Sequence, residues 1–123
     1  MNSDELIKRT KGFAHRCVKL AMTLPETDLG KHLSRQVIRC STSAAANYRA
    51  TCLAQSRAGF IAKISIVLEE TDETAFWLEF VIDEKLLKRS LVEPLLKESI
   101  ELTAIFAASR KTASAKDKSD RIH

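Results

Sequence analysis

Apolar side chains recur at intervals of three and four residues along most of the chain, which is the spacing of one face of an α-helix. The first such stretch runs from Asp4 to Leu24, with Ser3 as its predicted N-cap. It ends before Pro25, because the residue that precedes a proline is disfavoured in helical conformation. No long stretch alternates between polar and apolar residues as a β-strand does. The pattern therefore predicts helices and no sheet.

A second helix is predicted from its N-cap Thr27 to about Gln55, and a third begins at residues 56–58 and ends near Lys85. Ser56 favours a break between the two, because serine is a good N-cap. In an alternative interpretation the two helices fuse, and the chain forms three long helices.

The fourth helix is predicted to begin with a capping box, in which Ser90 and Glu93 satisfy each other's free backbone N–H groups. Pro94 is tolerated near this start, because the N–H groups of the first turn have no helical partner. The apolar face of this helix continues to about Arg110, where we expect the helix to end.

Short connections between helices favour an antiparallel up-down-up-down bundle, because they force neighbouring helices to run in opposite directions. A chain of 123 residues has room for one ordinary domain. We therefore predict an all-α four-helix bundle domain over residues 1–112. Residues 113–123 have almost no apolar content and are predicted to form a disordered basic C-terminal tail.

The third predicted helix is apolar on two sides. One side carries the stripe that a bundle core requires, and the other carries Ile66, Phe76, Trp77 and Phe80. A helix that is apolar on two sides is buried on two sides, and aromatic residues are enriched where proteins meet. These four residues are therefore predicted to form the subunit interface of a homo-oligomer.

The composition bears on where the protein is found. The number of cysteines is odd: Cys17, Cys40 and Cys52. We interpret them as small core residues in a reducing cytoplasm. No apolar run approaches the roughly 20 residues that cross a bilayer. The N-terminal segment lacks the apolar stretch of a secretory signal. We expect a cytoplasmic protein with no membrane partner.

Charge is distributed unevenly around the net value of +4. Residues 1–57 carry ten Lys or Arg and four Asp or Glu, whereas residues 58–86 carry two and seven. Cations on the first two predicted helices can form a face that follows the phosphates of RNA or DNA, although an ordinary solvated face has the same composition. The candidate nucleic-acid-binding residues are Lys8, Arg9, Lys11, Arg16, Lys19, Lys31, Arg35 and Arg49.

The carboxylates Glu70 and Glu73 are the strongest candidates for chemistry. A di-metal site would need a Glu-x-x-His motif on partner helices, and the chain has none, so we predict no metal and no cofactor. The alternative is a structural polar network in which these carboxylates pair with Arg39, Asn47 or Arg49 of the second helix. With no phosphate-binding loop and no recognisable catalytic order of side chains, we predict no catalytic residues and no enzymatic activity.

The run RQVIRCSTSAAANYRATCLAQSRAGFIAKISIVLEETDETAFWLEF, residues 35–80, resembles the four-helix bundle family of 23S rRNA-intervening-sequence proteins. The resemblance rests on the Ser/Ala-rich stretch ending in Asn47, the QSRAGF turn and the EETDETAFWLE block, and it extends over about residues 5–110. The chain departs from the family at Gly59, where relatives often carry an acidic residue that completes a capping box with Ser56.

The resemblance implies a homopentamer, shaped like a barrel with a central channel and without known enzymatic activity. Some members are encoded inside sequences inserted into large-subunit rRNA genes. A related branch, the accessory protein of diversity-generating retroelements, uses a basic bundle surface to bind nucleic acid and the reverse transcriptase.

Three functions follow as hypotheses. The leading one is a non-enzymatic, oligomeric binding protein whose basic exterior contacts RNA or DNA. The second is a protein–protein adaptor or scaffold ring with no direct nucleic-acid role. The third, a metal-dependent enzyme that uses Glu70 and Glu73, requires bound metal, which we do not expect.

Overall fold

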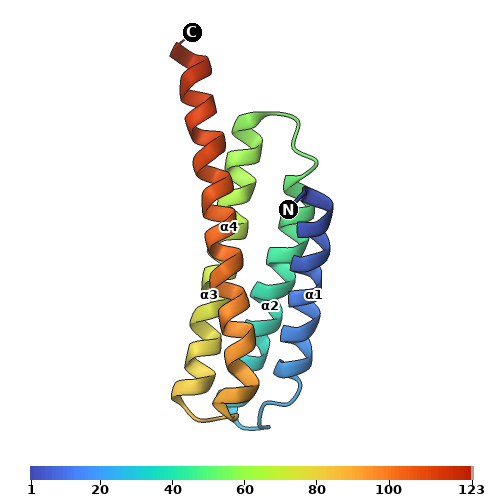
Figure 1. Ribbon diagram of the computed structural model, residues 1–123. Helices are drawn as coiled ribbons and strands as arrows, with labels where there is room; N and C mark the ends of the chain where they lie inside the picture. Colours follow the sequence, from blue (N-terminus) through green and yellow to red (C-terminus); the bar gives the residue numbers. More distant parts are fainter. Residues whose placement is uncertain (123) are drawn as a thin grey trace.

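The computed structural model describes residues 1–122, and the regular secondary structure in that range is entirely helical. The elements are α1 (Ser3–Ala21), α2 (Asp28–Thr51), α3 (Arg57–Asp83) and α4 (Arg89–Ile122). Figure 1 shows the α1–α2 and α3–α4 connections at one end of the molecule and the α2–α3 connection at the other. The predicted all-α four-helix bundle is confirmed. The three-helix alternative is wrong, because an irregular segment separates α2 from α3.

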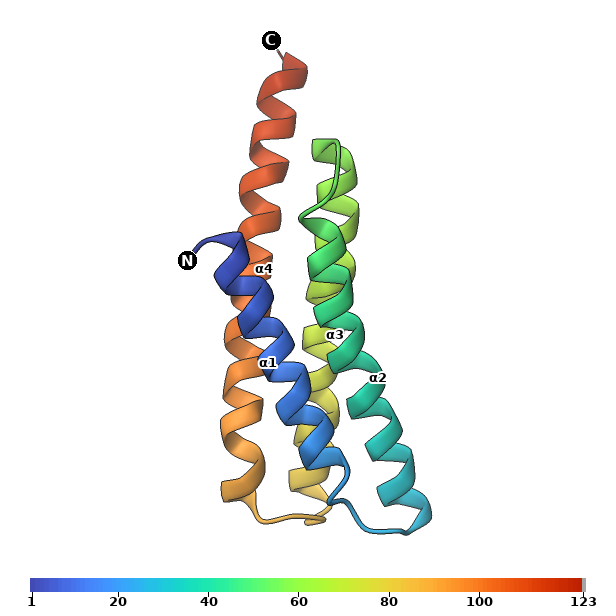
Figure 2. The same cartoon turned by 90° about the vertical axis from the view of Figure 1, so that its right-hand side faces the viewer.

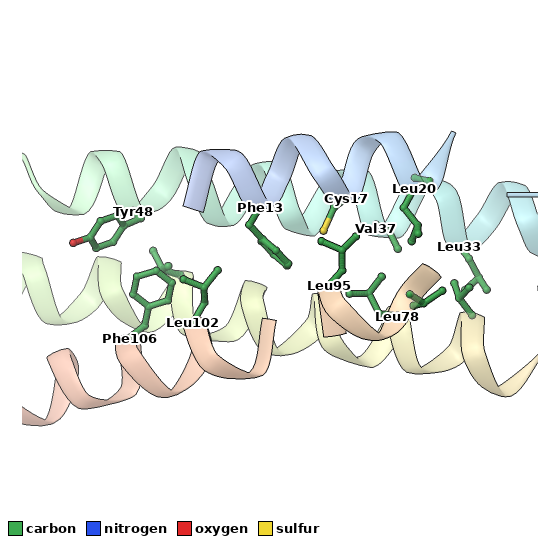
Figure 3. Packing of buried hydrophobic residues seen from close by; sticks show 14 of the residues in the cluster. Phe13, Cys17, Leu20, Leu33, Val37, Tyr48, Leu78, Leu95, Leu102 and Phe106 are labelled. Atoms are coloured by element: carbon green, nitrogen blue, oxygen red, sulfur yellow. The ribbon is translucent and has the colours of Figure 1, made fainter. Parts of the chain in front are cut away.

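The four helices pack around one core. Each helix contacts the next in sequence, and α1 also contacts α4, so the four close into a bundle (Figure 2). Large apolar side chains from all four helices meet along the axis (Figure 3). One example is Tyr48 of α2 against Phe106 of α4, whose ring centroids lie 5.0 Å apart. The core also holds Cys17 and Cys40, whereas Cys52 is exposed at the end of α2, so its predicted core position is wrong.

The helix starts follow side-chain capping. Thr27 caps α2 as predicted, and its Oγ1 accepts a hydrogen bond from the Gly30 N–H at 3.1 Å. Ser56 caps α3 in the same way. The predicted N-cap Ser3 is wrong by one position, because the Asn2 Oδ1 accepts from the Glu5 N–H at 2.8 Å and asparagine caps as well as serine does.

The fourth helix differs most from its prediction. It begins at Arg89, so Ser90 lies inside the helix and not at an N-cap. It also continues to Ile122, so the predicted end near Arg110 is wrong, and residues 113–122 are helical where a disordered tail is predicted. Residue 123 of the predicted tail lies outside the described residues. The segment after Arg110 contains no glycine or proline to stop a helix, and alanine and lysine favour helix formation. Figures 1 and 2 show this last part of α4 extending beyond the other three helices.

The end of α3 is a Schellman motif built without glycine. Lys85 has a φ of 55°. Its N–H donates a hydrogen bond to the Ile82 carbonyl at 3.0 Å, and the Leu86 N–H donates one to the Val81 carbonyl at 3.1 Å. These two bonds satisfy carbonyls at the helix end and turn the chain towards α4.

A short polar seam joins α3 to α4 inside the bundle. The buried Ser99 hydroxyl donates to the Thr71 carbonyl at 2.6 Å, and the Thr103 hydroxyl donates to the Thr71 hydroxyl at 2.9 Å. Because buried hydroxyls are costly to leave unpaired, this seam favours one register between the two helices.

Candidate nucleic-acid and subunit interfaces

The structure exposes most of the predicted basic residues on the outer sides of α1 and α2. None of them forms a salt bridge with a residue in the described part of the chain. The exposed residues of this set are Lys8, Lys11, Arg16, Lys19, Lys31, Arg35 and Arg49.

Arg9 is the exception, because its guanidinium is taken up by α4. Its Nε and Nη2 donate to the two oxygens of Glu98 at 2.8 and 2.6 Å, and Nη2 also lies 2.9 Å from Glu101. These hydrogen bonds raise the pKa of Arg9 and lower the pKa of Glu98. Arg9 therefore links α1 to α4, and its predicted place on the free basic face is wrong.

Two of the exposed cations border a groove between α1 and α2. The groove has a volume of about 460 Å³, and its lining includes small apolar side chains such as Ala14, Ala45 and Ala46. Lys11 of α1 and Arg49 of α2 are also among the lining residues of the groove. The short side chains of α2 leave the hollow, and the cations beside it make it a basic groove.

Lys31 and Arg35 lie beside a different hollow, formed where the α1–α2 connection meets α2. A larger hollow, of about 810 Å³, lies between the start of α3 and the far part of α4. Arg57 contributes to its lining and is ion-paired with Asp120. The predicted basic residues therefore gather on the α1 and α2 side and not at this larger hollow.

The predicted subunit interface on α3 is partly open to solvent. Ile66 is 44% exposed and Phe76 is 50% exposed, while Trp77 and Phe80 are partly buried against the core. The three aromatic rings form a continuous cluster, with centroid distances of 4.9 Å for Phe76–Trp77 and 5.8 Å for Phe76–Phe80. His32 of α2 meets the Trp77 ring edge to face at 5.5 Å.

The predicted polar network joins α2 to α3 beside this cluster. Arg39 is ion-paired with Glu73 and lies 3.5 Å from Glu70. The Trp77 Nε1–H donates to the same Glu73 carboxylate at 3.0 Å. Asn47 does not take part, because its amide donates to the backbone and hydroxyl oxygens of Ser43 one turn away on α2.

Besides the Arg9–Glu98 link, sequence reasoning missed three features of these surfaces. The Glu73–Trp77 hydrogen bond has a sequence signal, since residues four apart meet on a helix. The Arg39 Nε donates to the Gln36 side chain over a three-residue spacing, which gives the same kind of signal. The contact of His32 with Trp77 crosses between helices and has no local signal.

Two of the three thiols, those of Cys17 and Cys40, are buried. Burial raises the pKa of Cys17 to about 12, and burial also raises the pKa of Cys40. Both therefore remain protonated near neutral pH.

Among the residues that the structure describes, no group of three or more His, Cys, Asp or Glu side chains is placed to hold a metal ion. Within that part of the chain, no helix is long and apolar enough to cross a membrane.

Comparison with known proteins decides the family. The family model described as 23S rRNA-intervening sequence protein matches residues 3–108. The chain belongs to this family. The match ends before the part of α4 that extends beyond the other helices, so the 23S rRNA-intervening sequence protein unit corresponds to the bundle itself.

One solved relative of this 23S rRNA-intervening sequence protein supports the same fold. It is a protein of unknown function from the S23 ribosomal protein family of Bacteroides thetaiotaomicron. It is 33% identical, with a TM-score of 0.82, and the alignment covers 90% of this chain and 99% of that one. No curated protein matches the sequence.

Proposed function

We propose that this 23S rRNA-intervening sequence protein is a non-enzymatic, homo-oligomeric protein that binds RNA or DNA through exposed cations of α1 and α2. One observation carries the proposal: these cations face solvent without a carboxylate partner among the described residues. Cations that are free in this way neutralise phosphates and release counterions, which is the main source of sequence-independent affinity for nucleic acids.

The separation of charge supports a directional contact. Residues 58–86, which include all of α3 except its first residue, carry seven acidic residues and two basic ones, so the field of this segment repels phosphate. The opposite balance on the first two helices attracts it. A nucleic acid approaching the subunit is therefore steered to α1 and α2.

The first prediction is that binding depends on salt and on Lys31 and Arg35. Fluorescence anisotropy with a structured RNA and a duplex DNA, at about 50 to 200 mM salt, gives the slope of log K against log salt. Replacing both residues by Glu should weaken binding and reduce this slope by about two, roughly one for each lost phosphate contact.

The matched control replaces Lys97 and Lys111 by Glu. Both are exposed lysines of α4, outside the proposed surface, and the charge change is the same. This control should bind far better than the α2 variant. Absence of binding by the wild type, or binding that does not change with salt, would contradict the proposal.

The proposed self-association rests on the half-exposed aromatic cluster of α3. A large aromatic surface in water is unfavourable, and aromatic residues are frequent in subunit interfaces. We expect a homo-oligomer, and the resemblance implies a pentamer. Light scattering that gives the monomer mass of 13.8 kDa would rule this out.

The same cluster also favours a second candidate, an adaptor that presents Phe76 and Ile66 to another protein. In that case one protein partner should be recovered in fixed stoichiometry after nuclease treatment. The anisotropy experiment should then show no binding to either nucleic acid.

A further inference from the structure

We propose that the outer face of α3 in one copy seats in the basic groove between α1 and α2 of the next copy, so that subunits associate head to tail. This inference rests on the proposed self-association and adds which two surfaces meet. The occupant of the groove is a second copy of this chain.

The groove offers a hollow with positive charge beside it. Ala14, Ala45 and Ala46 are among its lining residues, and their short side chains leave room for a large side chain of a partner. Lys11 and Arg49 line it from its two helices, and neither has a salt-bridge partner among the described residues. An apolar hollow beside cations fits an apolar projection that carries carboxylates at its sides.

The outer face of α3 has that chemistry. Phe76 is half-exposed and forms the open edge of the aromatic cluster. Glu69, Asp72 and Glu79 are exposed on the same helix, and none of them forms a salt bridge with a described residue. The helix therefore presents an aromatic projection flanked by unpaired carboxylates.

Charge also disfavours the simplest alternative, in which two copies join through α3 alone. A two-fold contact would place the acidic faces of two α3 helices against each other, and like charges facing each other oppose association. Pairing α3 with the α1–α2 groove brings opposite charges together. The groove is lined by residues of α1 and α2, and α3 does not contact α1 in the described part of the chain, so one subunit can use both surfaces at once.

Head-to-tail contacts of this kind form rings when the rotation between subunits closes. The contact also divides the basic residues between two tasks. Lys11 and Arg49 become buried against the neighbouring copy, whereas Lys31 and Arg35 lie at a different hollow and stay available for phosphate.

The test uses two variants that each damage one surface. The groove variant carries Lys11→Glu and Arg49→Glu, and the α3 variant carries Phe76→Glu. Each should run as a monomer of 13.8 kDa in size-exclusion chromatography with light scattering. Mixed together they should form a dimer of one copy of each, because the intact α3 of one fits the intact groove of the other and no further contact can follow.

Contact through α3 alone gives a different pattern. The groove variant would then keep the wild-type mass, and the mixture would contain no mixed dimer. Either result overturns the head-to-tail contact while leaving self-association in place. A monomeric wild-type protein would overturn both.

Two further variants separate this contact from loss of folding. Ala46→Trp fills the groove without changing charge and should also give a monomer, with a helical circular dichroism spectrum like that of the wild type. Lys31→Glu with Arg35→Glu repeats the charge change outside the groove and should keep the wild-type mass. A monomer in this second case would show a general charge effect and would contradict the proposed contact.

Discussion

Gly30 lies where the first turn of α2 passes close to the chain that leaves α1. A Cβ at this position would be 2.0 Å from the Pro25 carbonyl oxygen. Because this oxygen belongs to the backbone, the turn itself would have to shift to make room. We predict that Gly30→Ala lowers the free energy of unfolding by about 1–3 kcal/mol, as overpacking typically does. Gly12 is the matched control, because a Cβ there meets nothing within 4 Å. Gly12→Ala should raise stability by up to about 1 kcal/mol, since alanine is the better helix former. Urea unfolding of both variants checks the signs, and equal effects would contradict the close approach.

Capping residues show what the sequence can predict at this scale. Thr27 and Ser56 are the caps that the sequence predicts, because each is a strong capping residue placed before an apolar-periodic stretch. Asn2 and Ser3 are neighbours of equal capping ability, so local sequence cannot choose between them. Lys85 has no sequence signal for its positive φ, because lysine ordinarily avoids this conformation.

Between elements, the link from α1 to α4 depends on Arg9 and Glu98, whose side chains are 23% and 17% exposed. Arg9 lowers the pKa of Glu98, so the pair stabilises the fold above the ordinary pKa of a glutamate and loses this effect as the carboxylate is protonated in acid. We predict that Glu98→Gln lowers the free energy of unfolding by about 1–3 kcal/mol at pH 7. The difference from the wild type should disappear as the pH falls below about 4. Glu101→Gln is the control, because Glu101 is 63% exposed and its pairing should contribute at most about 1 kcal/mol. Denaturant unfolding at several pH values measures both, and a loss that persists in acid would contradict the electrostatic origin.

Helix number and helix faces could be predicted because they follow from periodicity, and the pairing of Arg39 with Glu70 and Glu73 follows from facing positions on α2 and α3. The position of Arg9 could not, because residues 9 and 98 lie far apart in sequence and only the closure of α1 on α4 brings them together. The predicted pairing of Asn47 with α3 is wrong for a related reason. Its amide finds a partner within its own helix, which one-dimensional pattern cannot distinguish from a partner on α3.

For the molecule as a whole, the two proposed contacts use one property, the separation of a basic α1–α2 side from an acidic α3. In a head-to-tail assembly the acidic face is covered by each neighbour, and the remaining cations are repeated once per subunit. Modest affinity at each subunit then becomes strong binding of one long ligand, because the later contacts are intramolecular. In the proposed assembly, the charge-separated bundle should therefore bind such a ligand more strongly than a monomer would.

The far part of α4 belongs to the molecule but not to its core. The last buried large side chain of α4 is Phe106, and the family match ends at residue 108. Beyond them, one contact between the helix and the bundle is the ion pair between Asp120 and Arg57, both substantially exposed. Exposed pairs contribute about 0–1 kcal/mol. We therefore predict that a chain ending at Thr112 loses at most about 1 kcal/mol of unfolding free energy and keeps the denaturant m-value of the bundle, because m follows the core surface exposed on unfolding. Guanidinium unfolding followed by circular dichroism measures both. A large fall in the midpoint would show instead that the overhanging helix is required for the fold.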